Sequence, residues 1–232
     1  MKTKIINIIF LIAFAAMLGC SKDNIEPTTS STTKSLKDLE ISWSYYYDGS
    51  PVSSFSSAQS IEYSFADESS MRIYSFSTEQ LFLNWAANQN YYVNGVKIDL
   101  VNYHNNLTTI GNYALNTGAD VYFDTYGTIR SDVVSLMDSL LILPGPIEAS
   151  LRRLYDNTYY SDQIHSSFFI PIPSLGNARD RAESLKQTGP GLNAYCDRRW
   201  FLGPRLYVLS VIENKIENLG AWNNRFESIS PC

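Results

Sequence analysis

The chain has 232 residues, 44% of them hydrophobic and 13% aromatic, which is enough for one large domain or two small ones with buried cores. Its 18 basic and 23 acidic residues give a net charge of −5 at pH 7, so it repels nucleic acid phosphates and anionic lipid surfaces. We therefore expect no nucleic acid partner.

Residues 1–19 are expected to be a lipoprotein signal peptide. Lys2 and Lys4 precede an apolar run that is too short to cross a bilayer as a helix. The run ends in Met-Leu-Gly-Cys20, which resembles a bacterial lipobox. This resemblance implies that Cys20 becomes the mature N-terminus and carries the lipid that anchors the protein to a membrane. The alternative is a cleaved signal with an incidental cysteine.

Residues 20–37 are expected to form a flexible tether. Residues 21–26 resemble the export signal of surface lipoproteins in the Bacteroidetes, and residues 27–35 are nearly all Ser and Thr, which cannot form a core. Without Lys2 and Lys4 the chain has 16 basic residues against 23 acidic ones, a net charge of about −7. The expected location is the outer membrane or the cell surface, with membrane contact through the lipid.

Residues 38–147 are expected to form a small α+β domain. Apolar and polar residues alternate from Leu39 to Tyr47, which predicts a strand that ends at Asp48-Gly49. Residues 61–65 and 71–76 alternate in the same way on either side of a polar turn, so a hairpin is expected there.

Three helices are expected in the same region. Ser77 and Gln80 form a capping box for the first, which continues through Trp85. The second extends from Ile98 to Ala114. Ser131 is the expected N-cap of the third, whose apolar residues recur with helical spacing through Leu141. Residues 144–146 (Pro-Gly-Pro) are expected to mark a domain boundary.

Residues 148–232 contain an internal repeat. Residues 181–185 and 225–229 share the pattern Arg-x-Glu-Ser-aliphatic, with the serines 44 positions apart (228 − 184). Upstream, one pair of aromatic residues recurs 40 positions later (195 − 155), and a repeat of this length indicates two copies of one supersecondary unit. The aromatic residues are Tyr155 and Tyr160 in the first copy and Tyr195 and Trp200 in the second.

This repeat resembles the Greek-key motif of the βγ-crystallin family. The resemblance implies an all-β Greek-key sandwich after the α+β region, with motifs at about residues 151–190 and 191–232. A single motif has half a core, so we expect the two to share one sandwich.

The βγ-crystallin resemblance also suggests a calcium loop in the second motif. The candidate ligands are Asn223, Asn224, Glu227 and Ser228, whose oxygens suit the ion. In the first motif, Arg179 occupies the first ligand position and would repel a cation. We favour the alternative in which Ser184 and Ser228 hydrogen-bond to backbone while Leu185 and Ile229 enter the core. No cofactor is otherwise expected.

Two cysteines remain if Cys20 carries lipid. Cys196 and Cys232 would then lie in an oxidising compartment, where a pair normally forms a disulfide. The resemblance implies that the first and last strands of the motif are neighbours, which would bring the two together. The alternative is that Cys196 is a small buried hydrophobic residue and Cys232 a loose end.

Catalytic motifs are not evident in the sequence. The two histidines, His104 and His165, have no second His or Cys at metal-ligand spacing, and no hydrolase or phosphate-loop pattern occurs. The leading hypothesis is therefore a non-catalytic, envelope-anchored lipoprotein that binds a protein or a glycan. One alternative is a protease inhibitor on a crystallin-like fold, with Ile170–Pro173 as its rigid exposed loop. Another is a carboxylate-based enzyme, because paired acids follow no spacing rule.

Overall fold

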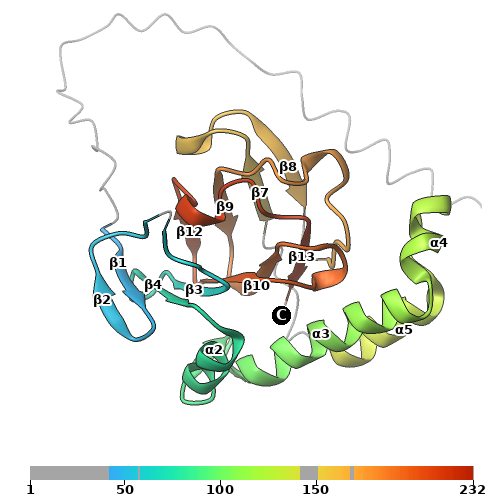
Figure 1. Ribbon diagram of the computed structural model, residues 1–232, viewed down its shortest axis with the longest axis horizontal. Coiled ribbons are helices and arrows are strands. Elements are labelled where there is room, and N and C mark those ends of the chain that lie inside the picture. The colour runs from blue at the N-terminus through green and yellow to red at the C-terminus, as the bar shows by residue number, and fades with distance from the viewer. Residues whose placement is uncertain (1–41, 57, 142–150, 168–169, 232) are drawn as a thin grey trace, which may run out of the picture. The chain divides into compact units, whose positions relative to one another are not determined.

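The computed structural model describes residues 42–56, 58–141, 151–167 and 170–231 (Figure 1). The predicted signal peptide, Cys20 and the tether lie outside the described residues, as do Cys232 and the predicted boundary at residues 144–146. All described residues belong to one compact unit.

Strands come first in the described chain. The predicted hairpin is confirmed, since β3 and β4 pair antiparallel. Asp67 fixes its turn by accepting hydrogen bonds from Ser69 N at 3.0 Å and from Ser70 Oγ at 2.8 Å. The strand that was predicted from Leu39 onward begins at Ser44 and lies parallel to β4. These strands are β1 (Ser44–Tyr47), β2 (Ser50–Val52), β3 (Tyr63–Asp67) and β4 (Arg72–Phe76).

The three predicted helices form, with small shifts at their ends. Thr78, one residue after the predicted Ser77, caps the first helix through its side chain. Arg130 takes the N-cap position that was predicted for Ser131, and its side chain makes no capping bond. The helices are α2 (Glu79–Ala86), α3 (Leu100–Asn116) and α5 (Ser131–Leu140).

Two features of this region were not predicted. A short helix, α4 (Ala119–Tyr126), lies between Gly118 and Gly127, whose φ angles of 69° and 68° turn the chain at its two ends. A small hairpin turns at Asn94-Gly95, where both φ angles are positive. Its strands are β5 (Tyr91–Val93) and β6 (Val96–Ile98).

Two Greek-key motifs follow residue 150. In each, the first strand lies between the second and the fourth, giving the orders β9-β7-β8 and β13-β10-β11. The third strand of each motif crosses to the sheet of the other, because β12 pairs with β9 and Ile172 pairs with Ile229 of β13. The two motifs therefore share one crystallin-like sandwich. Its strands are β7 (Leu151–Tyr155), β8 (Gln163–Ser167), β9 (Ser184–Thr188), β10 (Gly191–Cys196), β11 (Arg205–Ser210), β12 (Glu213–Ile216) and β13 (Ser228–Pro231).

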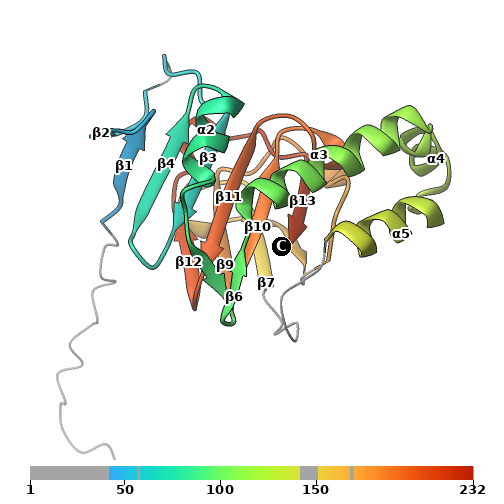
Figure 2. The same cartoon turned by 90° about the horizontal axis from the view of Figure 1, so that it is seen from below.

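The second motif continues into the N-terminal strands. β11 runs parallel to β3, with Tyr207 opposite Phe65, and joins both regions into a seven-stranded sheet of order β13-β10-β11-β3-β4-β1-β2 (Figure 2). The regions expected as separate domains, residues 38–147 and 148–232, thus share one sheet.

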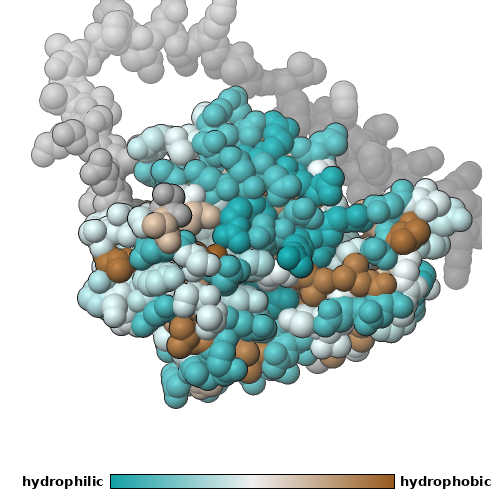
Figure 3. Space-filling view, viewed as in Figure 1, coloured by the Kyte–Doolittle hydropathy of each residue, from teal (hydrophilic) through white to brown (hydrophobic). Residues whose placement is uncertain are grey.

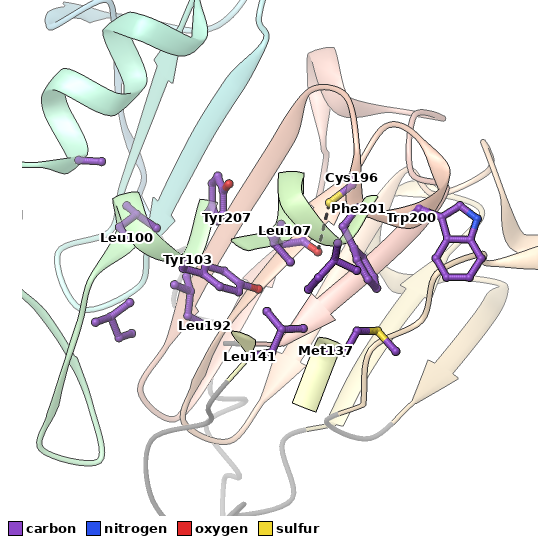
Figure 4. Close-up of a cluster of buried hydrophobic side chains, with 14 of the residues drawn as sticks. Leu100, Tyr103, Leu107, Met137, Leu141, Leu192, Cys196, Trp200, Phe201 and Tyr207 are labelled. Carbon is purple, nitrogen blue, oxygen red and sulfur yellow. Dashed lines mark hydrogen bonds between the residues drawn. The ribbon is translucent and has the colours of Figure 1, made fainter. Parts of the chain in front are cut away.

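The seven-stranded sheet separates two hydrophobic cores. Leu206 and Val208 of β11 enter the core shared with the four-stranded sheet, whereas Tyr207 and Leu209 enter the core beneath the helices. Figure 4 shows part of this second core, where side chains of α3 and α5 meet those of β10 and β11. The helices therefore cover the face of the sheet that the sandwich leaves open.

Candidate functional site

The second motif has a 3-10 turn after its first strand, η3 (Arg199–Phe201), which the repeat serine holds in place. Ser228 Oγ donates to the Arg198 carbonyl at 2.6 Å and accepts from Phe201 N at 3.0 Å. Ile229 is fully buried in the core. The predicted capping role of Ser228 is confirmed.

The first motif repeats these contacts at its own turn, η1 (Thr158–Tyr160). Ser184 Oγ donates to the Asn157 carbonyl at 2.7 Å and accepts from Tyr160 N at 3.2 Å. Leu185 is fully buried. The predicted capping role of Ser184 is therefore confirmed as well.

The paired contacts correct the alignment of the two aromatic pairs. The carbonyls that the serines bind are 41 positions apart (198 − 157), not 40. Tyr155 therefore corresponds to Cys196 and not to Tyr195, since Tyr155 lies opposite one repeat serine and Cys196 opposite the other. Tyr195 lies one residue before the true counterpart of Tyr155. Its side chain enters the core between the two sheets of the sandwich, where its ring lies 5.3 Å from that of Phe226.

The same correction pairs Trp200 with Tyr159, and Phe201 with Tyr160. Tyr159 and Trp200 both have left-handed backbone, with φ of 57° and 59°. Their surroundings differ, because Tyr159 is 74% exposed and Trp200 only 1%. In the first motif, Tyr160 packs edge-on against Tyr155 at 5.7 Å.

Two of the four candidate calcium ligands, Glu227 and Ser228, already form hydrogen bonds within the protein. Glu227 Oε2 accepts from Arg199 N at 3.1 Å, and Ser228 caps the turn. Asn224 is exposed with a φ of 57°, and Asn223 Oδ1 has no hydrogen-bond partner among the described residues. Within the described ranges, no cluster of three or more His, Cys, Asp or Glu side chains suits a metal ion.

Cys196 carries a free thiol that is fully buried, and burial raises its pKa to about 11. The prediction that the first and last strands of the second motif are neighbours is confirmed, because β10 pairs with β13. The pairing is antiparallel, however, so Cys196 lies opposite Ser228 and Asn193 lies opposite Pro231. This direction leads β13 away from Cys196 as far as Pro231, and Cys232 lies outside the described residues, so the disulfide stays a prediction.

The segment proposed as an inhibitory loop is the third strand of the first motif. Ile172 exchanges backbone hydrogen bonds of 2.8 Å and 3.0 Å with Ile229, and the Pro173 carbonyl accepts from Trp200 N at 2.9 Å. Only Ile170 is exposed, at 60%. This segment therefore lacks the free loop that the inhibitor hypothesis needs.

His104 lies in a buried polar network between α2, α3 and β11. Its Nε2 is 2.5 Å from Glu79 Oε1, and its Nδ1 is 2.7 Å from Tyr207 Oη and 3.0 Å from Arg205 Nη1. A guanidinium only donates, so Nδ1 accepts and the ring proton sits on Nε2, facing Glu79. Burial and the nearby Arg205 charge lower the pKa of His104 to about 4. The network joins the helices to the sheet.

His165 faces the interior of the sandwich beside a polar row of the four-stranded sheet. Burial lowers its pKa, and so does the charge of Arg152. Arg152 donates to Asn193 Oδ1 at 3.2 Å and to the Ile170 carbonyl at 2.7 Å, which links the two motifs. His104 thus serves internal contacts, whereas Nε2 of His165 is buried without a hydrogen-bond partner among the described residues. Cross-strand neighbours in the row are Ser167, Arg152, Gln187 and Asn214.

A close approach of α3 to η3 buries Trp200. Gly111 of α3 has no side chain, and a Cβ there would lie 2.4 Å from the Trp200 carbonyl oxygen and 2.5 Å from Leu202 Cγ. The Trp200 ring meets Phe123 of α4 edge-on at 5.7 Å. This contact was not predicted, although a glycine at position 111 within a helical pattern is a sequence signal for such a close approach.

A hollow of about 400 Å³ opens beside this contact, and we call it the η3 groove. Arg199 at its rim is held by Asp124 of α4 through two hydrogen bonds of 2.6 Å and 3.0 Å. Apolar surface is visible in this part of the molecule, next to α3 and on α4 (Figure 3). The groove is lined by Leu115, Asp120, Arg198, Arg199, Trp200, Leu202 and Glu227.

Only part of this groove was predicted from the sequence. Two of its residues were noted in the sequence for other reasons: Trp200 as an aromatic residue of the repeat, and Glu227 as a candidate calcium ligand. The other lining residues come from α3, α4 and the flanks of η3, and no motif connects them in sequence. Their meeting depends on the packing of α3 and α4 against η3.

Comparisons with solved structures match about a third of the chain. A βγ-crystallin domain from Flavobacterium johnsoniae is 19% identical, covering 35% of this chain and 92% of its own length, with a TM-score of 0.29. The N-terminal domain of protein S is 20% identical, covering 36% of this chain and 96% of its own length, with a TM-score of 0.29. Comparison with protein-family models and with curated proteins finds no match.

No helix within the described residues is long and apolar enough to span a membrane.

Proposed function

We propose that the chain is a non-catalytic binding protein of the cell envelope, anchored at the outer membrane or cell surface by lipid on Cys20. The lipobox-like run before Cys20 and the Ser/Thr-rich tether after it support the anchoring. Both ring nitrogens of His104 are engaged in internal hydrogen bonds, which supports binding rather than catalysis at that residue.

The η3 groove is the proposed ligand site, and its composition is the observation that carries the proposal. Leu115, which is 48% exposed, and Leu202 provide apolar surface, while Asp120, Arg198 and Glu227 provide charged groups. Ligand sites typically combine apolar lining with a few polar groups that fix orientation, in volumes of about 300 to 1,000 Å³.

A pull-down from envelope extract tests the groove. The mature chain without its lipid should retain a partner that the Leu115→Asp variant loses, because a carboxylate would be introduced into the apolar wall. Val134→Asp on α5 is the matched control, since Val134 is also exposed on a helix but does not line the groove. Equal retention by both variants would contradict the proposed site.

Fractionation tests the anchor. Replacing Cys20 with Ala should move the mature chain into the soluble periplasmic fraction, because the acyl chains that hold it would be missing. If the variant still sediments with membranes after a carbonate wash, the anchoring proposal fails.

A further inference from the structure

We infer that the η3 groove binds a neutral glycan, through neighbouring hydroxyl groups of a sugar ring. This inference rests on the proposed function, because it names the ligand class of the same groove. Two features of the groove support it. Some hydrogen-bonding groups in the lining have no partner, and the positive and negative charges of the lining balance.

Three residues of the groove lining carry N–H donors that lack an acceptor or an ion-pair partner among the described residues. Arg199 Nε and the indole Nε1 of Trp200 are buried and have no hydrogen-bond partner within the described residues. Figure 4 shows the indole nitrogen turned away from the other core side chains. Arg198 is exposed, and its guanidinium forms no ion pair with any described residue. Buried donors normally find an acceptor, so the unpartnered N–H groups of Arg199 and Trp200 favour a ligand with oxygen atoms.

Acceptors lie among these donors. Glu227 uses Oε2 for Arg199 N, which leaves Oε1 for a ligand, and Asp120 is half-buried in the first turn of α4. A sugar hydroxyl both donates and accepts, so adjacent hydroxyls can satisfy a carboxylate and a guanidinium together. The mixture of donors and acceptors therefore matches a polyhydroxy ligand.

The charges argue for a neutral ligand. The lining contains two arginines and two carboxylates, and Arg199 is already paired with a third carboxylate, Asp124. A sulfate, phosphate or uronate placed beside Arg198 would also meet Asp120 and Glu227, and like charges at short range repel. Leu115 and Leu202 can contact the apolar face of a sugar ring.

Titration with defined oligosaccharides tests this inference on the mature chain without its lipid. The probes are maltohexaose, cellohexaose, mannohexaose and xylohexaose, with oligogalacturonate as the anionic comparison. Binding is followed by calorimetry and by tryptophan fluorescence, since Trp200 lines the groove. We expect at least one neutral probe to bind at millimolar concentration or below, and oligogalacturonate to bind more weakly.

Conservative variants locate the binding. The Asp120→Asn and Arg198→Gln substitutions should each weaken binding of the neutral probe by roughly tenfold, since each removes a charged hydrogen-bonding partner. Asp138→Asn on α5 and Arg72→Gln on β4 are matched controls, both exposed and outside the groove, and should leave binding unchanged.

Two outcomes overturn the inference. Preference for oligogalacturonate would contradict a neutral ligand, and binding unaffected by the groove variants would contradict the site. If no neutral probe binds but an envelope partner is still retained and is lost with Leu115→Asp, the glycan inference fails while the proposed function stands. If Leu115→Asp also changes nothing, both fail.

Discussion

The two Greek-key motifs contain a turn of the same conformation, but only the turn of the second motif is buried. Tyr159 and Trp200 share a left-handed backbone within turns that equivalent serines cap, yet Tyr159 is exposed and Trp200 is buried. The conformation is therefore set locally by the motif and its capping serine. Burial is set by α3 and α4, which cover the second turn and form one wall of the η3 groove.

The largest effect should come from removing the buried aromatic ring of the second turn. Trp200→Ala should lower the free energy of unfolding by about 3 to 5 kcal/mol, because it empties a buried ring site. Tyr159→Ala is the matched control and should change it by no more than about 0.5 kcal/mol, since an exposed side chain loses few contacts. Urea unfolding of both variants checks this. Equal losses would remove the distinction between the turns.

Acidification tests how the second motif is joined to the helices. The pKa of His104 is about 4 in the folded protein against an ordinary 6.5, so the unfolded chain binds more protons between these values. His104 should therefore lower stability as pH falls from about 6.5 to about 4, by on the order of 3 kcal/mol.

His104→Gln provides the comparison, because it removes this titration and leaves the other groups. The difference in unfolding free energy between wild type and variant should shrink on acidification across that window. A difference that stays constant with pH would show that His104 is not held neutral by the network.

Gly111→Ala should disturb the second turn alone. A methyl group 2.4 Å from the Trp200 carbonyl forces α3 and η3 apart, and such overpacking costs about 1 to 3 kcal/mol. Asn112→Ala, at an exposed position of the same helix, should be neutral or slightly stabilising because Ala favours helices. Thermal unfolding distinguishes them, and a Gly111→Ala protein as stable as Asn112→Ala would contradict the close approach.

The smallest effect should come from the shared caps. Ser228→Ala and Ser184→Ala each remove two hydrogen bonds to backbone groups of a turn, so each should lower the unfolding free energy by about 1 to 2 kcal/mol. Because the caps are equivalent, we expect similar losses. A loss at only one serine, measured by urea unfolding, would break the equivalence of the turns.

Local features of the fold could be predicted from the sequence. Alternation indicated the β3–β4 hairpin, and helical spacing indicated α3 and α5. The Asn94-Gly95 pair was an available hairpin signal that was overlooked. The parallel pairing of β11 with β3 joins residues about 140 positions apart, and local pattern does not reveal such contacts.

The candidate site was less predictable because its parts meet only in space. The serine caps followed from the repeat, but the aromatic pairs were aligned one residue out because Tyr195 and Trp200 are themselves aromatic. The prediction that the first and last strands of the second motif are neighbours was correct, but the sequence did not reveal that Cys196 lies opposite Ser228. The disulfide itself stays a prediction, because Cys232 lies outside the described residues. The η3 groove depends on how α3 and α4 pack against a turn some 80 residues away from them.

The decisive experiment compares how well the Leu115→Asp and Tyr159→Ala variants retain an envelope partner. We expect Leu115→Asp to lose the partner and Tyr159→Ala to keep it, because the covered turn forms the ligand site and the exposed turn does not. Loss with Tyr159→Ala and retention with Leu115→Asp would contradict this expectation, and would assign binding to the first motif.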